Sequence, residues 1–230
     1  MKISIIIPTL NEEKNLPLVL EDIKKFFDGR QEYNYEVIIV DNCSKDGTLK
    51  IAKENNCRVL LNPIIGKGSS LKKGLEIAKG DILITMDADV SNRASEIGLL
   101  IEGIKSGYDV VFGSRFIQGG GSEDIEWYRK IGNKFFIFLV NFLWKTNYSD
   151  LCYGYQAFSR EAKEKLLPHI KCQGFGIETE IAIKVAKLRL KVLEIPSVEK
   201  KRKYGKSNLK TIKDGWGILI IIVKELFFKI

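Results

Sequence analysis

The chain has 230 residues, of which 45% are hydrophobic and 29% are charged, so it is long and apolar enough to bury a core and is not intrinsically disordered. Its net charge of +8, from 37 Lys and Arg against 29 Asp and Glu, favours an anionic partner such as a phosphate-bearing substrate or a membrane surface. Because no nucleic-acid recognition motif accompanies that charge, we expect no nucleic-acid partner.

The first half of the chain alternates short apolar runs with segments of helical apolar spacing. This alternation predicts strands at 2–7, 35–40, 58–61, 81–86 and 108–112, and helices at 13–27, 47–54, 69–78 and 96–104. Repeated strand–helix units imply an α/β fold, with a mostly parallel, Rossmann-like sheet flanked by helices. Ligands of such sheets bind beyond the carboxyl ends of the strands.

Four short polar motifs fall at those carboxyl ends, and their clustering there is the strongest indication of a binding site in the sequence. They are 8–12 (Pro-Thr-Leu-Asn-Glu), 41–42 (Asp-Asn), 87–89 (Asp-Ala-Asp) and 113–115 (Gly-Ser-Arg). Since strands of a parallel sheet end at one edge, we expect these motifs to lie close together.

The pair Asp87 and Asp89 is the most informative of these motifs. Side chains two apart in a strand share a face, so both carboxylates are expected to point the same way. Like charges that close repel unless a cation lies between them, and a divalent ion with oxygen ligands suits the position. The alternative is helix capping at a strand-to-helix turn, a role that aspartate also fills well.

The second half of the chain has a different character. We expect a glycine-rich loop at 118–123, a long helix at 125–144, an added strand at 153–158, a helix at 177–188 and a strand at 192–195. A basic loop at 198–207 and an apolar final helix at 209–228 follow. No linker or repeat interrupts the chain, so residues 1–230 are expected to form a single domain, in which 209–230 is a C-terminal amphipathic helical elaboration.

The motif order resembles family 2 glycosyltransferases of the GT-A fold, and most of all the polyprenyl-phosphate (dolichol-phosphate) mannose and glucose synthases. The resemblance covers nearly the whole chain. It rests on the motifs at 6–12, 40–48, 66–69, 87–89 and 113–116, and on Arg202 with the segment 204–207.

The resemblance implies that 1–112 bind an NDP-sugar and that 113–208 bind the acceptor. It assigns the nucleotide-sugar to Pro8, Thr9, Glu12, Asp41, Asn42, Lys67, Asp87, Ala88, Asp89 and Arg202. Within that set, Asp87 and Asp89 would hold Mg²⁺ or Mn²⁺ on the diphosphate, and Asp89 would be the more direct ligand. The metal would stabilise the charge that develops on the departing nucleoside diphosphate.

The implied acceptor is a polyprenyl or dolichyl phosphate, whose anionic oxygen needs no general base. By position in the family, Arg115 and Arg129 would seat this phosphate, with Asn133 one helical turn beyond Arg129. Asp89, Arg115 and Arg129 are therefore the expected catalytic residues of an inverting transferase. Two alternatives stay open: a hydroxyl acceptor with Asp150, Glu178 or Glu180 as base, and a non-catalytic nucleotide-binding subunit.

A lipid acceptor requires contact with a bilayer. The segments 131–144 and 217–230 are apolar and aromatic, with Lys134, Lys145, Lys224 and Lys229 at or within them, and such segments can lie in the membrane interface. No signal peptide or bilayer-spanning run is visible in the sequence. We therefore expect a peripheral protein at the cytoplasmic face of the membrane, or one that docks on a separate membrane subunit. The four cysteines are expected to be reduced thiols.

Overall fold

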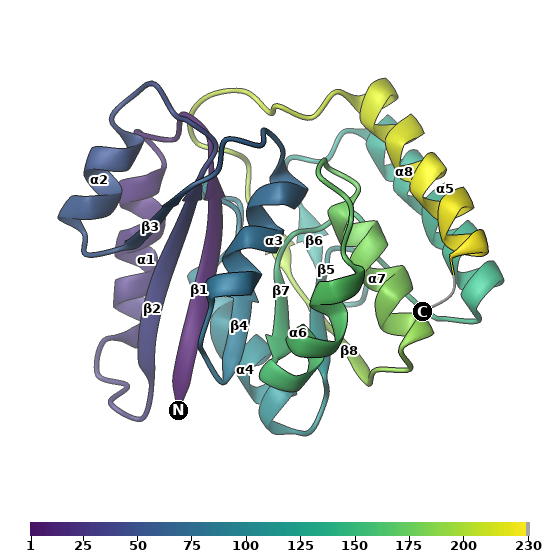
Figure 1. Ribbon diagram of the computed structural model, residues 1–230, viewed down its shortest axis with the longest axis horizontal. Helices are drawn as coiled ribbons and strands as arrows, with labels where there is room; N and C mark the ends of the chain where they lie inside the picture. The colour runs from purple at the N-terminus through teal and green to yellow at the C-terminus, as the bar shows by residue number, and fades with distance from the viewer. Residues whose placement is uncertain (229–230) are drawn as a thin grey trace.

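The computed structural model describes residues 1–228, and its centre is a seven-stranded sheet in the order β3-β2-β1-β4-β7-β5-β8 (Figure 1). Six strands run parallel, and β7 is antiparallel to both of its neighbours, β4 and β5. The strands are β1 (Lys2–Thr9), β2 (Asn34–Asp41), β3 (Arg58–Leu61), β4 (Ile82–Thr85), β5 (Val110–Ser114), β7 (Gln156–Ser159) and β8 (Val192–Pro196). The predicted mostly parallel sheet is confirmed.

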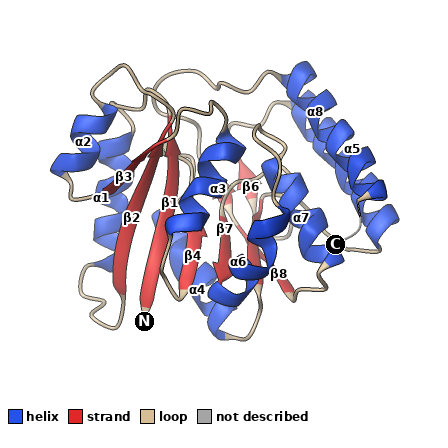
Figure 2. Ribbon diagram, in the orientation of Figure 1, coloured by secondary structure: helices blue, strands red, loops and turns tan. Residues whose placement is uncertain are grey.

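Helices cover both faces of this sheet, as the colouring by secondary structure in Figure 2 makes plain. They are α1 (Leu16–Phe27), α2 (Thr48–Glu54), α3 (Lys67–Ile77), α4 (Ile97–Lys105), α5 (Trp127–Trp144), α6 (Arg160–Leu166), α7 (Ile177–Lys187) and α8 (Thr211–Phe227). Two 3₁₀ turns, η1 (Ala94–Glu96) and η2 (Leu167–His169), and a two-stranded ribbon of β6 (Gly121–Ser122) and β9 (Val198–Glu199) complete the set.

The sheet is apolar on both sides because its strands are buried on both sides. In β1, Ile3, Ile5 and Ile7 pack into one core layer with α1, α2 and α4. Ile6 points to the other face and packs with α3, α6 and α7. The two-residue alternation of side chains thus lets one strand support two cores.

The final helix is fixed to the body of the protein by a buried charge cluster. Glu225 of α8 is 4% exposed, and its carboxylate lies 2.8 Å from Nζ of Lys184 and 2.7 Å from Nζ of Lys187, both on α7. Because breaking a buried ion pair leaves an uncompensated charge, this cluster holds α8 in a fixed orientation. Lys229 and Ile230, at the end of the predicted helix, lie outside the described residues.

Three differences from the sequence-based expectation affect the site or the topology. Strand β4 ends at Thr85 rather than at residue 86, so Asp87 and Asp89 lie in the following loop and not on the pleat of a strand. Helix α6 was not expected, although Ser159 caps it by accepting a hydrogen bond from the backbone N–H of Ala162. The two loops expected at 118–123 and 198–207 pair with each other through β6 and β9.

Candidate functional site

A cavity of 540 Å³ opens where the predicted motifs meet. Its lining includes residues from the ends of β1, β4 and β5, from α5 and α8, and from the segment after β9. Twelve of the thirteen residues assigned to a site from the sequence are among them: Pro8, Thr9, Glu12, Asn42, Lys67, Asp87, Ala88, Asp89, Arg115, Arg129, Asn133 and Arg202. The exception is Asp41, which lies beneath the cavity surface and is fully buried.

Asp87 forms an ion pair with Lys67. The Nζ atom of Lys67 lies 2.7 Å from Oδ1 of Asp87 and 2.8 Å from Oε1 of Glu178, a residue of α7 that is 4% exposed. Burial alone would lower the pKa of Lys67, but the two adjacent carboxylates outweigh it and raise that pKa above its usual value. The side chain is therefore a permanent cation held between two acids.

Asp89 forms a second ion pair with Arg202. The Nη2 atom of Arg202 donates to Oδ2 of Asp89 at 2.8 Å, and Nη1 donates to Oε1 of Glu12 at 3.0 Å. The other oxygen of Asp89 accepts hydrogen bonds from the backbone N–H and the hydroxyl of Ser91. Arg202 thereby ties the segment after β9 to the ends of β1 and β4.

That segment is also held at Tyr204. The side-chain amide of Asn15 donates to the carbonyl of Tyr204 at 3.0 Å and accepts from its N–H at 3.2 Å. The long connection to α8 thus crosses over the carboxyl ends of the strands before it reaches the helix (Figure 1).

The glycines around Lys67 are required by a close approach of the backbone. A Cβ atom on Gly66 would lie 2.1 Å from the carbonyl oxygen of Gln173, and one on Gly68 would lie 2.5 Å from that of Cys172. Gly66 also has a φ of +147°, a conformation that other residues rarely adopt. The loop 172–174 therefore seats the first turn of α3 and presents Lys67 to the cavity.

The end of β2 organises the neighbouring loops. Asp41 accepts hydrogen bonds from Thr9 and from the backbone N–H and hydroxyl of Ser44. Asn42 donates to the carbonyl oxygens of Asn62 and Ile64. These side chains fix the floor of the cavity, and Asn42 contributes to its surface.

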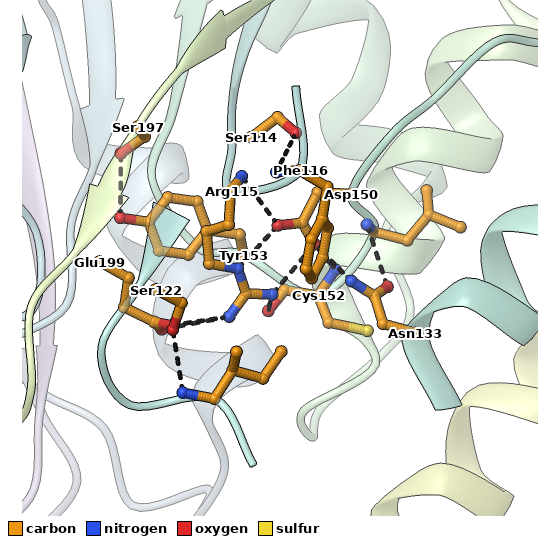
Figure 3. Close-up of polar contacts among 12 residues, drawn as sticks. Ser114, Arg115, Phe116, Ser122, Asn133, Asp150, Cys152, Tyr153, Ser197 and Glu199 are labelled. Atoms are coloured by element: carbon orange, nitrogen blue, oxygen red, sulfur yellow. Dashed lines mark hydrogen bonds and ion pairs between the residues drawn. The ribbon is translucent and has the colours of Figure 1, made fainter. Parts of the chain in front are cut away.

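Arg115 is held by two carboxylates, as Figure 3 shows. Its Nε and Nη2 donate to the two oxygens of Asp150 at 2.7 and 3.0 Å, and its Nη1 donates to Glu199 at 3.1 Å. Burial works against the charge, but Asp150 and then Glu199 outweigh it and raise the pKa of Arg115 above its usual range. The guanidinium lines the cavity, but most of its N–H groups already donate to Asp150 and Glu199.

Asn133 belongs to the same network. Its amide donates to Oδ1 of Asp150 at 2.7 Å and accepts from the backbone N–H of Leu151 at 3.3 Å (Figure 3). The backbone N–H groups of Arg115 and Cys152 also donate to Asp150, which is 5% exposed. A carboxylate with this many donors has no oxygen left to take up a proton from a substrate.

Arg129 lines the cavity in a more open setting. Its Nε donates to the hydroxyl of Thr211 on α8 at 3.2 Å and lies 3.2 Å from Oε2 of Glu126. Its side chain is 26% exposed. The hydrogen bond uses Nε, which leaves the terminal nitrogens to reach an anion in the cavity.

Helices α5 and α8 form an apolar wall of the cavity and an exposed apolar surface outside it. They lie side by side at one end of the sheet (Figure 1). Phe136 of α5 and Ile218 of α8 line the inside, together with Leu209 just before α8. We call the outer face the α5/α8 face; its large exposed residues are Trp127, Tyr128, Ile131, Phe135, Phe138, Phe142, Leu143, Ile212, Trp216, Ile220, Val223, Leu226 and Phe227. No helix within residues 1–228 is long and apolar enough to cross a bilayer.

The donor set fits a divalent cation only in part. Asp87 and Asp89 offer the hard oxygen ligands that Mg²⁺ and Mn²⁺ prefer. Within the described residues, no three His, Cys, Asp or Glu side chains come close enough together to hold a metal ion by themselves. A cation held here would therefore need ligands from a substrate.

The role of Glu178 in this site does not follow from the sequence. Glu178 is one of the possible bases by its position, whereas the structure pairs it with Lys67, which lies 111 positions earlier in the chain. The signal available was its place in the first turn of a predicted helix, where an acidic residue is common for electrostatic reasons alone. Glu180 turns away instead and accepts hydrogen bonds from the backbone of Lys171 and Cys172.

Residues 4–167 match the family model of glycosyl transferase family 2. The chain is 35% identical over 217 residues to a dolichol-phosphate mannosyltransferase of Pyrococcus furiosus, an alignment that spans 91% of this chain and 60% of that protein. It is 28% identical over 223 residues to the glycosyltransferase AglJ of Haloferax volcanii, with 95% of this chain and 70% of that protein covered. The chain thus spans less than two thirds of the first relative.

Among solved structures, the fold is similar to that of glucosyl-3-phosphoglycerate synthase from Mycobacterium tuberculosis. The TM-score is 0.75 at 21% sequence identity, and the match covers 100% of this chain and 81% of that one. That enzyme was crystallised with Mn²⁺, uridine diphosphate and glucosyl-3-phosphoglycerate. The likeness confirms the expected GT-A fold.

Proposed function

The chain belongs to glycosyl transferase family 2, a family of sugar-transferring enzymes, and from that premise we propose that it moves a hexose from an NDP-sugar to a polyprenyl or dolichyl phosphate. The donor would be of the GDP-mannose or UDP-glucose type, and the reaction would depend on a divalent metal and invert the anomeric carbon. The observation that carries the proposal is one cavity lined by paired carboxylates, by Arg129 and by the apolar helices α5 and α8.

Asp87 and Asp89 are the residues we assign to Mg²⁺ or Mn²⁺, with diphosphate oxygens as the remaining ligands. A cation bound there would neutralise the charge that develops on the leaving nucleoside diphosphate. Lys67 and Arg202 already contact the same two carboxylates, so they lie within reach of a diphosphate placed beside them. The nucleotide and sugar would lie against Pro8, Thr9, Glu12, Asn42 and Ala88, with Asp41 supporting them from beneath.

The bond changes need no proton transfer. A phosphate oxygen of the acceptor would form a bond to the anomeric carbon, while the bond from that carbon to the diphosphate breaks and its electron pair leaves with the diphosphate. A hydroxyl acceptor would need a carboxylate as general base, and the hydrogen bonds and ion pairs of the candidate carboxylates disfavour that role. Asp150 is saturated by Arg115 and Asn133, and Glu178 is paired with Lys67. Glu180 accepts backbone hydrogen bonds away from the cavity.

Arg129 is the residue we assign to the acceptor phosphate, because its guanidinium is partly exposed at the cavity and joins α5 to α8. Arg115 and Asn133 were expected to share that role. We propose instead that both hold the cavity wall through Asp150, since their hydrogen bonds are directed to it.

The α5/α8 face supports a peripheral association with the membrane. Its exposed aromatic and aliphatic side chains are accompanied by exposed Lys134, Lys145 and Lys224, and such a surface suits the interface of an anionic bilayer. We propose that it rests on the cytoplasmic face of the membrane, where an isoprenoid phosphate would reach the cavity between the two helices. Docking of this face on a separate membrane subunit is the competing possibility.

The direct test is turnover of radiolabelled GDP-mannose and UDP-glucose with a short polyprenyl phosphate, with Mn²⁺ or with EDTA. We expect lipid-linked hexose only with metal, and we expect Asp89→Asn to lower the rate on the order of 100-fold. Arg129→Gln should raise the KM for the acceptor without changing that for the donor. Lys50→Gln, at an exposed position of α2 and outside the α5/α8 face, is the matched control.

Either of two results would contradict the proposal. One is transfer to a hydroxyl compound such as phosphoglyceric acid, with none to the lipid phosphate. The other is tight nucleotide binding without turnover of any donor, which would indicate a non-catalytic subunit.

A further inference from the structure

A second cleft, of 470 Å³, lies outside the candidate site. It is formed by α1, by the turn η1 and by one residue of the segment after β9. Its lining residues are Asp22, Lys25, Phe26, Arg30, Arg93, Ala94, Ser95 and Lys200. Nothing in the proposed reaction uses this cleft.

The cleft is strongly cationic. Lys25, Arg30, Arg93 and Lys200 face one carboxylate, that of Asp22. Of these four, Lys25 alone has an ion-pair partner within residues 1–228, namely Glu21 at 2.7 Å. Four basic residues thus line one hollow against Asp22 in the lining and Glu21 beside Lys25, and this excess of two positive charges attracts an anion.

Arg93 gives the cleft a specific donor. Its Nε atom is buried and has no hydrogen-bond partner among the described residues. The backbone of Arg93 is fixed, because its carbonyl accepts a hydrogen bond from the hydroxyl of Tyr155 at 2.9 Å. Because Nε is itself closed off from solvent, an anion in the cleft would be bound by the terminal nitrogens of this guanidinium.

The cleft shares a wall with the candidate site. The backbone N–H of Lys200 donates to the carbonyl of Ser91 at 2.9 Å, which joins two segments that pass between the two hollows. On one segment Asp89 lines the first cavity and Arg93 the second. On the other, Arg202 lines the first and Lys200 the second.

We propose that this second cleft binds a small soluble anion that carries a phosphate or diphosphate group. Two arginines and a lysine offer the planar and point-charge donors that phosphate oxygens accept. A lipid headgroup fits the position less well, because α1 lies at the opposite end of the sheet from α5 and α8 (Figure 1). An anion seated there would hold together the two segments that carry Asp89 and Arg202.

The test uses inorganic phosphate as the probe, in EDTA and at constant ionic strength, followed by amide chemical shifts of the full chain. We expect saturable shifts at Arg93, Ser95 and Lys200. Arg93→Gln and Lys200→Gln should each weaken binding about ten-fold, since each removes a charge-assisted hydrogen bond. Lys200 is exposed, so its variant tests the site even if replacement of Arg93 disturbs the fold.

Two controls separate this cleft from the candidate site. Lys203→Gln, on the same segment but not in the cleft lining, should leave phosphate binding unchanged. Arg202→Gln alters the first cavity and should weaken phosphate binding much less than Lys200→Gln does. Absence of saturable shifts in the unaltered chain would overturn the proposal. So would binding that Arg202→Gln abolishes and Lys200→Gln preserves.

Discussion

The ammonium of Lys67 lies 2.7 Å from the carboxylate of Asp87, at the position where a metal-binding acid would be expected to meet a metal. The same ammonium is 2.8 Å from the buried carboxylate of Glu178, so one positive charge is shared between two acids. An internal cation thus occupies the neighbourhood of the proposed metal site, and a bound metal would have to share Asp87 with it.

This relationship predicts how Lys67→Met behaves. Without the ammonium, Asp87 and Glu178 face each other unpaired, and the free energy of unfolding should fall by about 3–5 kcal/mol. Mn²⁺ alone should then bind between these carboxylates and restore much of that loss. The measurement is thermal unfolding with and without Mn²⁺. Lys50→Met, on the exposed side of α2, is the matched control. A variant that gains no more from Mn²⁺ than the unaltered chain does would contradict this account.

The sequence predicted the sheet and the edge at which the site lies, because both follow from local pattern. Apolar runs locate the strands, and the motifs at 8–12, 87–89 and 113–115 begin in or just after the last residues of a strand. It could not predict the partners of Lys67, since Glu178 reaches it only through the packing of α7 across the sheet. The order of strands was likewise out of reach, because nothing local places β7 between β4 and β5.

The hydrogen-bond partners of Arg115 could not be predicted from its motif either. Its position after a strand end correctly brings it to the cavity wall, but its two acidic partners, Asp150 and Glu199, are distant in sequence. An arginine seen only in its motif looks available to a substrate phosphate. In the fold its donors are engaged, which changes the role that we assign to it.

Arg115→Met is therefore predicted to act on stability. The buried Asp150 and the partly buried Glu199 would lose their cation, and the free energy of unfolding should drop by about 3–5 kcal/mol, whereas Arg129→Gln should change it by about 0.5 kcal/mol or less. Urea denaturation followed by circular dichroism measures both. If Arg115→Met unfolded like the unaltered chain but bound the lipid phosphate poorly, Arg115 would have to contact the acceptor directly.

The four cysteines should differ sharply in reactivity. Burial, and next the nearby Asp150, raise the pKa of the Cys152 thiol to about 12, whereas Cys43 is exposed. At pH 8 about one Cys152 thiol in ten thousand would be ionised, and its alkylation rate should rise about ten-fold for each further pH unit. Iodoacetamide labelling followed by mass spectrometry should modify Cys43 first. The rate at Cys152 should become that of an ordinary thiol in guanidinium, and rapid labelling of native Cys152 would contradict its raised pKa.

Membrane attachment should depend on the α5/α8 face rather than on charge alone. Phe138 and Trp216 are 66% and 63% exposed, one on each helix, so serine at both positions removes apolar contact area without opening the core. We expect this double variant to lose most of its cosedimentation with vesicles that contain anionic lipid, because transfer of apolar area into the interface supplies the larger part of the binding free energy. Its melting temperature should stay near that of the unaltered chain. Leu61→Ser, at a 56% exposed position on β3 at the far edge of the sheet, is the matched control and should sediment normally. Equal loss in both variants would mean that the α5/α8 face has no special part in attachment. Normal cosedimentation of the double variant would mean that the basic side chains, and not the apolar ones, supply the binding.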